Sequence, residues 1–132
     1  MDLEILEIAS NTKNHKVLKK HTHQSKNKNP LCGDEMEISL IVKNNIVQDI
    51  GYQCKSCVYC QASVSLLSQS VKNENLDEIK NFIASCEKIF ENTKFTLEKK
   101  WNNFKELFDK KHESRKECLL LPVRTLLKAI ND

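Results

Sequence analysis

The sequence lacks most of the features that would assign a chain of 132 residues to a common class of protein. Its longest apolar runs, such as residues 119–121, are far shorter than the roughly 20 residues that a transmembrane helix needs. Residues 1–4 carry neither the basic nor the apolar region of a secretory signal, so we expect a cytoplasmic location. A phosphate loop, a dinucleotide-binding fingerprint and a Ser-His-Asp elbow are also missing, which argues against a conventional enzyme.

The charge pattern does not favour a nucleic-acid partner. The formal net charge is only +3, and the lysines are spread along the chain without an RNA- or DNA-binding signature. A hydrophobic fraction of 39% and a charged fraction of 30% are ordinary for a soluble protein, and we expect a single domain over residues 1–132. The 6 cysteines are the distinctive component, because in a reducing compartment they should be thiols or metal ligands.

Alternating segments in the first half of the chain predict an antiparallel sheet. Residues 36–52 alternate apolar and polar positions around a tight turn at residues 43–45. This pattern is typical of a β-hairpin with one buried face. Residues 20–29 are polar, but the alternation that includes His21 and His23 favours a further strand at the edge of the sheet.

Helical spacing governs the rest of the chain. A short apolar stripe within residues 2–19 predicts an opening helix, and an amphipathic helix is expected around residues 76–83. A lysine-rich helix is predicted from Lys88 to Lys111, with its charged side in solvent, followed by a capping signal at Ser114 and a last amphipathic helix. Strands followed by a helical block indicate an α+β fold, with a small antiparallel sheet of about three strands covered on one face by helices.

Cysteines lie in three separate segments, each at the junction of two predicted elements. Residues 29–34 read NPLCGD, residues 54–60 read CKSCVYC, and residues 115–118 read RKEC. A fold that brings these junctions together would assemble three thiolates beside the carboxylate of Asp34. The glycine between the first cysteine and Asp34 gives the backbone freedom to point both side chains at one metal. Such mixed sulfur and oxygen ligands suit zinc or an iron–sulfur centre.

Pro122 indicates where the last helix begins. In a continuous helix its ring would clash with the carbonyl of Cys118, so we predict a start at about residues 119–121. Cys118 then lies at a helix N-terminus, where the helix dipole favours a thiolate. Arg115 and Lys116 add positive charge nearby.

These residues resemble the IscU/NifU/SufU family of iron–sulfur scaffolds over about residues 29–132. The resemblance rests on NPLCGD, the hairpin, a cysteine followed by a helix of small residues, and a late Arg-x-x-Cys before a terminal helix. It implies a SufE/NifU-like fold. It also implies that Cys32, Cys57 and Cys118 receive sulfur and hold a cluster, and that Asp34 is a fourth ligand or keeps the cluster labile.

The function that the resemblance implies is assembly of an iron–sulfur cluster. A cysteine desulfurase would deliver sulfur to Cys118 or Cys57, and a transient [2Fe–2S] cluster or iron would be held by Cys32, Asp34, Cys57 and Cys118. Apo iron–sulfur acceptor proteins would then take the cluster. The chain would act as a scaffold or sulfur carrier rather than a stand-alone catalyst, and a homodimer is compatible with this role.

The chain departs from the IscU branch in ways that favour the SufU branch. Glu117 stands where IscU-type members carry a His, their Leu-Pro-Pro-Val-Lys chaperone motif is absent, and a long segment separates the second and third cysteines. No second C-terminal domain of the NifU kind follows. A zinc-dependent sulfur-transfer protein using the same ligands is therefore the alternative. A structural zinc module for protein binding is disfavoured by an aspartate among three cysteines.

The remaining cysteines leave alternatives open. Cys54, Cys57 and Cys60 form Cys-x-x-Cys-x-x-Cys, but the further Cys-Pro of a ferredoxin and the second Cys-x-x-Cys of a zinc ribbon are both missing. Alignment with the family puts Cys57 in the ligand position, while Cys54 or Cys60 could share or take the role. Cys86 lies among apolar helical positions and is expected in the core.

The histidines are less informative. His15, His21, His23 and His112 all lie in polar stretches, so we expect them to be solvated. His21 and His23 also remain candidate ligands, because their strand would run beside the site.

Overall fold

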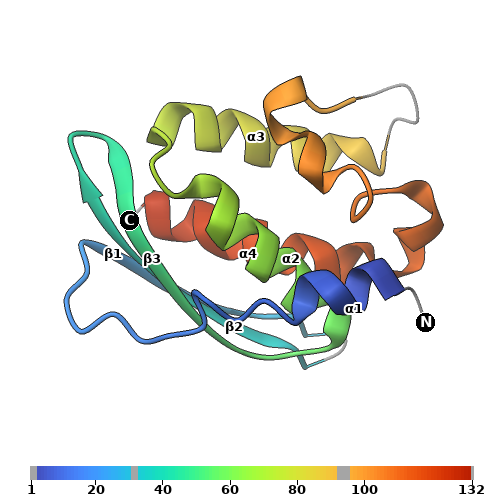
Figure 1. Cartoon of the computed structure of the whole chain (residues 1–132), viewed down its shortest axis with the longest axis horizontal. Helices are drawn as coiled ribbons and strands as arrows, with labels where there is room; N and C mark the ends of the chain where they lie inside the picture. The colour runs from blue at the N-terminus through green and yellow to red at the C-terminus, as the bar shows by residue number, and fades with distance from the viewer. Residues whose placement is uncertain (1–2, 31–32, 92–95, 132) are drawn as a thin grey trace.

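The computed structural model describes residues 3–30, 33–91 and 96–131, which form a three-stranded sheet and a layered set of helices (Figure 1). The elements in chain order are α1 (Leu3–Ala9), β1 (His23–Lys28), β2 (Glu35–Lys43), β3 (Ile46–Lys55), α2 (Val58–Val71), α3 (Leu76–Ile89), the 3-10 helices η1 (Lys99–Phe104) and η2 (Lys110–Arg115), and α4 (Lys116–Ile130). This order confirms the predicted α+β class. Within the described residues, no helix is both long and apolar enough to cross a membrane.

The sheet is antiparallel, with strand order β1-β2-β3. Its central register pairs Ser25 with Ile38 and Ile38 with Tyr52. The hairpin turn uses Asn44 and Asn45 at φ 56° and 65°, the left-handed conformation that tight hairpin turns require and that Asn tolerates. The predicted hairpin is therefore confirmed, as is the predicted edge strand.

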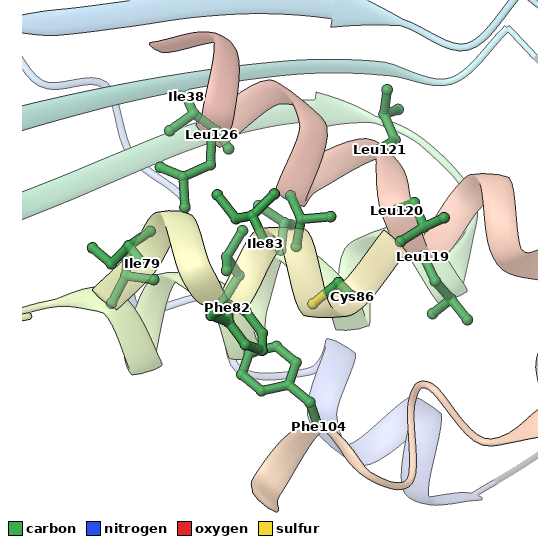
Figure 2. Close-up of a cluster of buried hydrophobic side chains, with 14 of the residues drawn as sticks. Ile38, Ile79, Phe82, Ile83, Cys86, Phe104, Leu119, Leu120, Leu121 and Leu126 are labelled. Carbon is green, nitrogen blue, oxygen red and sulfur yellow. The ribbon is translucent and has the colours of Figure 1, made fainter. Parts of the chain in front are cut away.

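Helices cover one face of the sheet. The alternate side chains Met36, Ile38 and Leu40 of β2 are buried at 2%, 0% and 0% exposure. α4 packs against β1 and β2, α2 packs against β3, and α3 lies on α4 away from the sheet (Figure 1). Figure 2 draws Ile38 from the sheet and Leu126 from α4 in one buried group with side chains of α3.

The predicted lysine-rich helix over residues 88–111 is wrong. α3 ends at Ile89, and the described part of the segment after it forms two short 3-10 helices. The reason is aromatic packing: the rings of Trp101 and Phe104 lie 4.4 and 4.7 Å from the ring of Phe82 on α3 (Figure 2 for Phe104). Trp101 takes non-helical angles to reach this position, so tertiary contacts override the local helical period.

The predicted start of the last helix is also wrong. α4 begins at Lys116 with Arg115 as its N-cap, while Ser114 belongs to η2. Pro122 therefore lies inside the helix and has no N–H to donate to the carbonyl of Cys118. The helix continues through the proline because its neighbours on both sides are buried apolar residues whose packing offsets that loss. Cys118, which was expected just before the helix, lies in its first turn and so still near the N-terminus.

The segment between α1 and β1 is fixed against β3 by a close backbone approach. A Cβ atom on Gly51 would lie only 2.6 Å from the carbonyl oxygen of Lys16. Beside it, buried Asn14 donates from Nδ2 to the Ser68 hydroxyl on α2 (3.1 Å), and its carbonyl accepts the N–H of Tyr52 (3.1 Å). Gly51 is thus required because a side chain would collide with the neighbouring backbone, and not because the residue has a positive φ.

We expect Gly51→Ala to lower the free energy of unfolding by about 1–3 kcal/mol, because the added methyl group forces the segment away from the strand. The midpoint and slope of urea unfolding measure this. Gln53→Ala, an exposed position on the same strand, is the matched control and should change stability by less than about 0.5 kcal/mol. Equal midpoints for the two variants would contradict the close approach.

Candidate metal centre

Three predicted ligands meet at one end of the sheet. One carboxylate oxygen of Asp34 and the Sγ atoms of Cys57 and Cys118 all lie within 4.8 Å of one another. Asp34 directly precedes β2, Cys57 is the N-cap of α2, and Cys118 lies in the first turn of α4. Figure 1 shows α2 and α4 beginning at this same end of the sheet. Cys32, the fourth predicted ligand, lies outside the described residues.

The burial of Asp34 is consistent with a role as a metal ligand. The residue is only 8% exposed, and its Oδ2 is buried without a hydrogen-bond partner among the described residues. Leaving a buried carboxylate oxygen unpaired is costly, and a bound cation is one way to satisfy it. Two thiol sulfurs and a carboxylate form a donor set that suits zinc or iron.

The loop that carries Asp34 is closed by backbone hydrogen bonds. The N–H of Gly33 donates to the carbonyl of Asn29 (2.8 Å), and the N–H of Asn29 donates to the carbonyl of Asp34 (2.8 Å). Gly33 has φ +76°, a left-handed conformation in which a side chain would be strained. The glycine between the cysteine and the aspartate therefore turns the chain, as the sequence predicts.

Cys57 is free to direct its sulfur toward Asp34 and Cys118 because it does not cap its own helix. It has extended N-cap angles (φ −69°, ψ 167°) and makes no side-chain capping hydrogen bond. Both Cys57 and Cys118 lie at the positive end of a helix dipole, which favours negative charge on their sulfurs. Cys57 is half-buried, whereas Cys118 is only 7% exposed.

Contacts between α2 and the chain around Cys118 set the distance between the two helix ends. The buried Ser63 hydroxyl donates to the carbonyl of Leu119 (2.7 Å), which is possible because a small residue stands at this crossing. Closer to the site, the guanidinium of Arg115 lies 5.2 Å from the ring centroid of Tyr59 on α2, and the ring of His112 lies 5.5 Å from it, edge to face. Tyr59 thus joins the segment before Cys118 to the helix that follows Cys57.

The prediction that His112 is exposed to solvent is wrong. The residue is only 6% exposed, and its Nδ1 lies 3.1 Å from the carbonyl oxygen of Leu107. Its polar neighbours in the sequence conceal this burial, and no local pattern signals it. The candidate ligands His21 and His23 are not in the group of metal-ligating atoms that the described residues form.

Glu117, which stands directly before Cys118, forms an ion pair within α4. Its carboxylate pairs with Arg124 about two turns further along α4. Arg124 also binds Glu87 on α3 through two N–H donors at 2.7 and 2.9 Å, and these carboxylates raise its pKa. Glu117 therefore helps to join α4 to α3 and is not one of the gathered ligands.

Of the other described cysteines, Cys54 and Cys60 lie near the site and Cys86 lies in the core. Burial raises the pKa of Cys54, and burial raises the pKa of Cys60 far more. Both thiols lie close enough to Asp34 for its charge to contribute to the rise. Cys86 is fully buried on α3, so its predicted place in the core is confirmed (Figure 2).

Comparison with known proteins identifies relatives along most of the chain. The model of the NifU-like N terminal domain family matches residues 2–103. The iron–sulfur cluster assembly scaffold protein IscU of Thermotoga maritima is 32% identical over 127 residues, which are 96% of this chain and 89% of that protein. The zinc-dependent sulfurtransferase SufU of Bacillus subtilis is 29% identical over 49 residues, which are 37% of this chain and 33% of that protein.

A solved structure confirms the fold. The crystal structure of a NifU-like protein (N-terminal) from Brucella abortus superposes with a TM-score of 0.90 at 21% sequence identity. The match covers 98% of this chain and 91% of that one. At this identity the likeness supports the predicted α+β architecture alone.

Replacing Asp34 should have opposite effects with and without metal. In metal-free protein, Asp34→Ala removes an unpaired buried carboxylate oxygen, so the free energy of unfolding should stay unchanged or rise by about 1 kcal/mol. With excess zinc, the variant should be less stable than wild type because a ligand is lost. Asp49→Ala is the control. This surface carboxylate pairs with Lys16 (3.2 Å), so the change in unfolding free energy on removing it should be the same with and without zinc. The same change for Asp34→Ala in both conditions would contradict its role.

Tyr59→Leu should weaken zinc binding. It removes the contacts with Arg115 and His112, together worth about 1 kcal/mol, which corresponds to roughly five- to tenfold in affinity. Tyr59→Phe keeps both ring contacts and should bind zinc like wild type. Competition with a chromophoric chelator measures the affinity. Equal affinities for the Leu and Phe variants would show that these contacts do not position the ligands.

Proposed function

This chain belongs to the NifU-like N-terminal domain family, and we propose that it is an iron–sulfur cluster assembly scaffold. It accepts sulfur from a cysteine desulfurase, holds a transient cluster, and passes that cluster to apo iron–sulfur acceptor proteins. The Thermotoga maritima relative, which carries the scaffold name, aligns with 96% of this chain. That coverage supports a shared function for the whole chain and not only a shared motif.

The cluster, which is the cargo of this reaction, would be held by Cys32, Asp34, Cys57 and Cys118. The observation that carries this proposal is the approach of Asp34, Cys57 and Cys118 within 4.8 Å at the junction of three chain segments. Thiolates are the usual ligands of iron–sulfur clusters. A carboxylate is a weaker ligand for such a centre than a thiolate. We therefore infer that Asp34 keeps the cluster transferable.

Cys57 is the better placed of the two candidate sulfur acceptors. It is half-buried and lies at a helix N-terminus, so an incoming persulfide can reach its sulfur. Cys118 is 7% exposed and lies among the buried residues of α4. We therefore infer that Cys57 receives the sulfur first, while Cys118 serves as a ligand.

Zinc-dependent sulfur transfer is the second candidate function. The Bacillus subtilis relative carries that name, and two sulfurs with one carboxylate also suit zinc. The same four residues would bind the ion, which would hold the ligating thiols in their thiolate form. Cys57 would then receive sulfur and pass it on as a persulfide. The two functions share residues and differ in what the protein carries.

The metal and acid-labile sulfide content of protein purified without oxygen separates the two functions. If the chain is a scaffold, we expect iron with a matching amount of sulfide, retained more firmly in Asp34→Ala because the weaker ligand is gone. If it is a zinc-dependent sulfur carrier, we expect zinc without labile sulfide, and less zinc in Asp34→Ala.

Asp49→Ala, which alters a carboxylate outside the site, should match wild type in both measurements. Folded wild-type protein that takes up neither metal nor sulfide, even after incubation with zinc or with iron and sulfide, would overturn both functions. Loss of iron from Asp34→Ala, in place of firmer retention, would contradict the role given to this residue in cluster transfer.

A further inference from the structure

Cys60 is a thiol beside the site that neither proposed function uses. It lies in the first turn of α2, three residues after Cys57, and is fully buried. Burial raises its pKa most, and Asp34 and Cys57 lie close enough for their charges to add to that rise. A cysteine at this position therefore calls for a chemical explanation as well as a packing one.

The backbone places Cys57 and Cys60 at a separation that a disulfide can span. Cys57 is the N-cap of α2 and Cys60 its third residue, and helix geometry puts Cα atoms at this spacing about 5 Å apart. Disulfides join Cα atoms about 4.4–6.8 Å apart. Cys-x-x-Cys at the start of a helix is also the arrangement in which thiol–disulfide chemistry is commonly found.

Cluster assembly creates a need for such a pair, and the inference rests on the proposed scaffold function. A persulfide carries its outer sulfur at the oxidation level of elemental sulfur, whereas a cluster contains sulfide. Two electrons per sulfur must therefore be supplied. Two thiols that become one disulfide release two electrons, which matches this requirement.

We propose that Cys60 is a catalytic residue that releases sulfide from a persulfide on Cys57. The outer sulfur of the persulfide takes the proton of the Cys60 thiol, and the Cys60 thiolate so formed attacks the Sγ of Cys57. A Cys57–Cys60 disulfide forms, the bond between the two persulfide sulfurs breaks, and the outer sulfur leaves as HS⁻. The sulfane sulfur is thereby reduced by two electrons, and the two cysteines are oxidised by two.

A second step returns the pair to its starting state. A dithiol reductant attacks the disulfide through a mixed disulfide, is itself oxidised to a disulfide, and leaves both cysteines as thiols. Cys57 is the half-buried member of the pair and the one at the helix end, so it is the sulfur that the reductant can reach. Each turn of this cycle delivers one sulfide beside Asp34 and Cys118.

The other neighbouring thiols fit this role less well. The Sγ of Cys118 lies within 4.8 Å of the Sγ of Cys57, but Cys118 is one of the proposed cluster ligands. Cys54 lies on β3, before α2 begins, so helix geometry does not set its separation from Cys57. Cys60 alone among these three is held by helical geometry next to Cys57 without a ligand role.

The test loads the full chain with sulfane sulfur and follows its fate. Reduced protein is treated under argon with glutathione persulfide, desalted, and assayed over time for released sulfide, then alkylated for peptide mass mapping. Wild type should release its loaded sulfur as sulfide and gain a Cys57–Cys60 disulfide. Cys60→Ser and Cys60→Ala should keep the persulfide on Cys57, with release slowed by about tenfold or more.

Cys54→Ser is the matched control, since it removes a neighbouring thiol that this mechanism does not use, and it should release sulfide like wild type. Release at the wild-type rate from both Cys60 variants would overturn the inference while leaving sulfur acceptance intact, and so would a wild-type disulfide mapped to Cys54 or Cys118. Absence of persulfide from every variant would overturn sulfur acceptance itself, and the inference with it. The wild-type disulfide map decides the question even if the Cys60 variants do not fold.

Discussion

The packing of α4 across the sheet is the constraint on which the rest of the structure depends. This helix contacts β1 and β2 on one side, α2 along its flank and α3 on its far side. Its residues 118–123 are all buried, so its position along the sheet cannot change without opening the core. Cys118 is part of this buried run, and its distance from Cys57 and Asp34 is consequently set by core packing rather than by a flexible loop.

Local patterns in the sequence were sufficient for the elements that are amphipathic by themselves. The alternation of residues 36–52 predicted the hairpin, and helical spacing predicted α3, because each of these elements buries one face against a neighbour. The gathering of Asp34, Cys57 and Cys118 could also be anticipated, since all three stand at the ends of such elements. Which of the three clustered cysteines faces the ligands came from the family resemblance and not from spacing.

The sequence could not predict the features that arise between distant segments. Trp101 and Phe104 have helical spacing, yet they pack on Phe82 of α3, and the chain bends into 3-10 turns to allow it. His112 is buried by the ring of Tyr59 and by the turn before it, although every local signal is polar. α4 starts before its proline because burial of its apolar face outweighs one missing hydrogen bond. In each case long-range packing prevails over local preference.

Both edges of the small sheet are protected against pairing with another sheet. On β3, the outward N–H of Tyr52 is taken by the carbonyl of Asn14, and that of Val47 by the carbonyl of Glu74. On β1, Lys26 and Lys28 supply exposed charges of the kind that discourage edge-to-edge association. For the proposed scaffold, contact with another chain at the thiol end can therefore be made and broken without the strands joining into a continuous sheet.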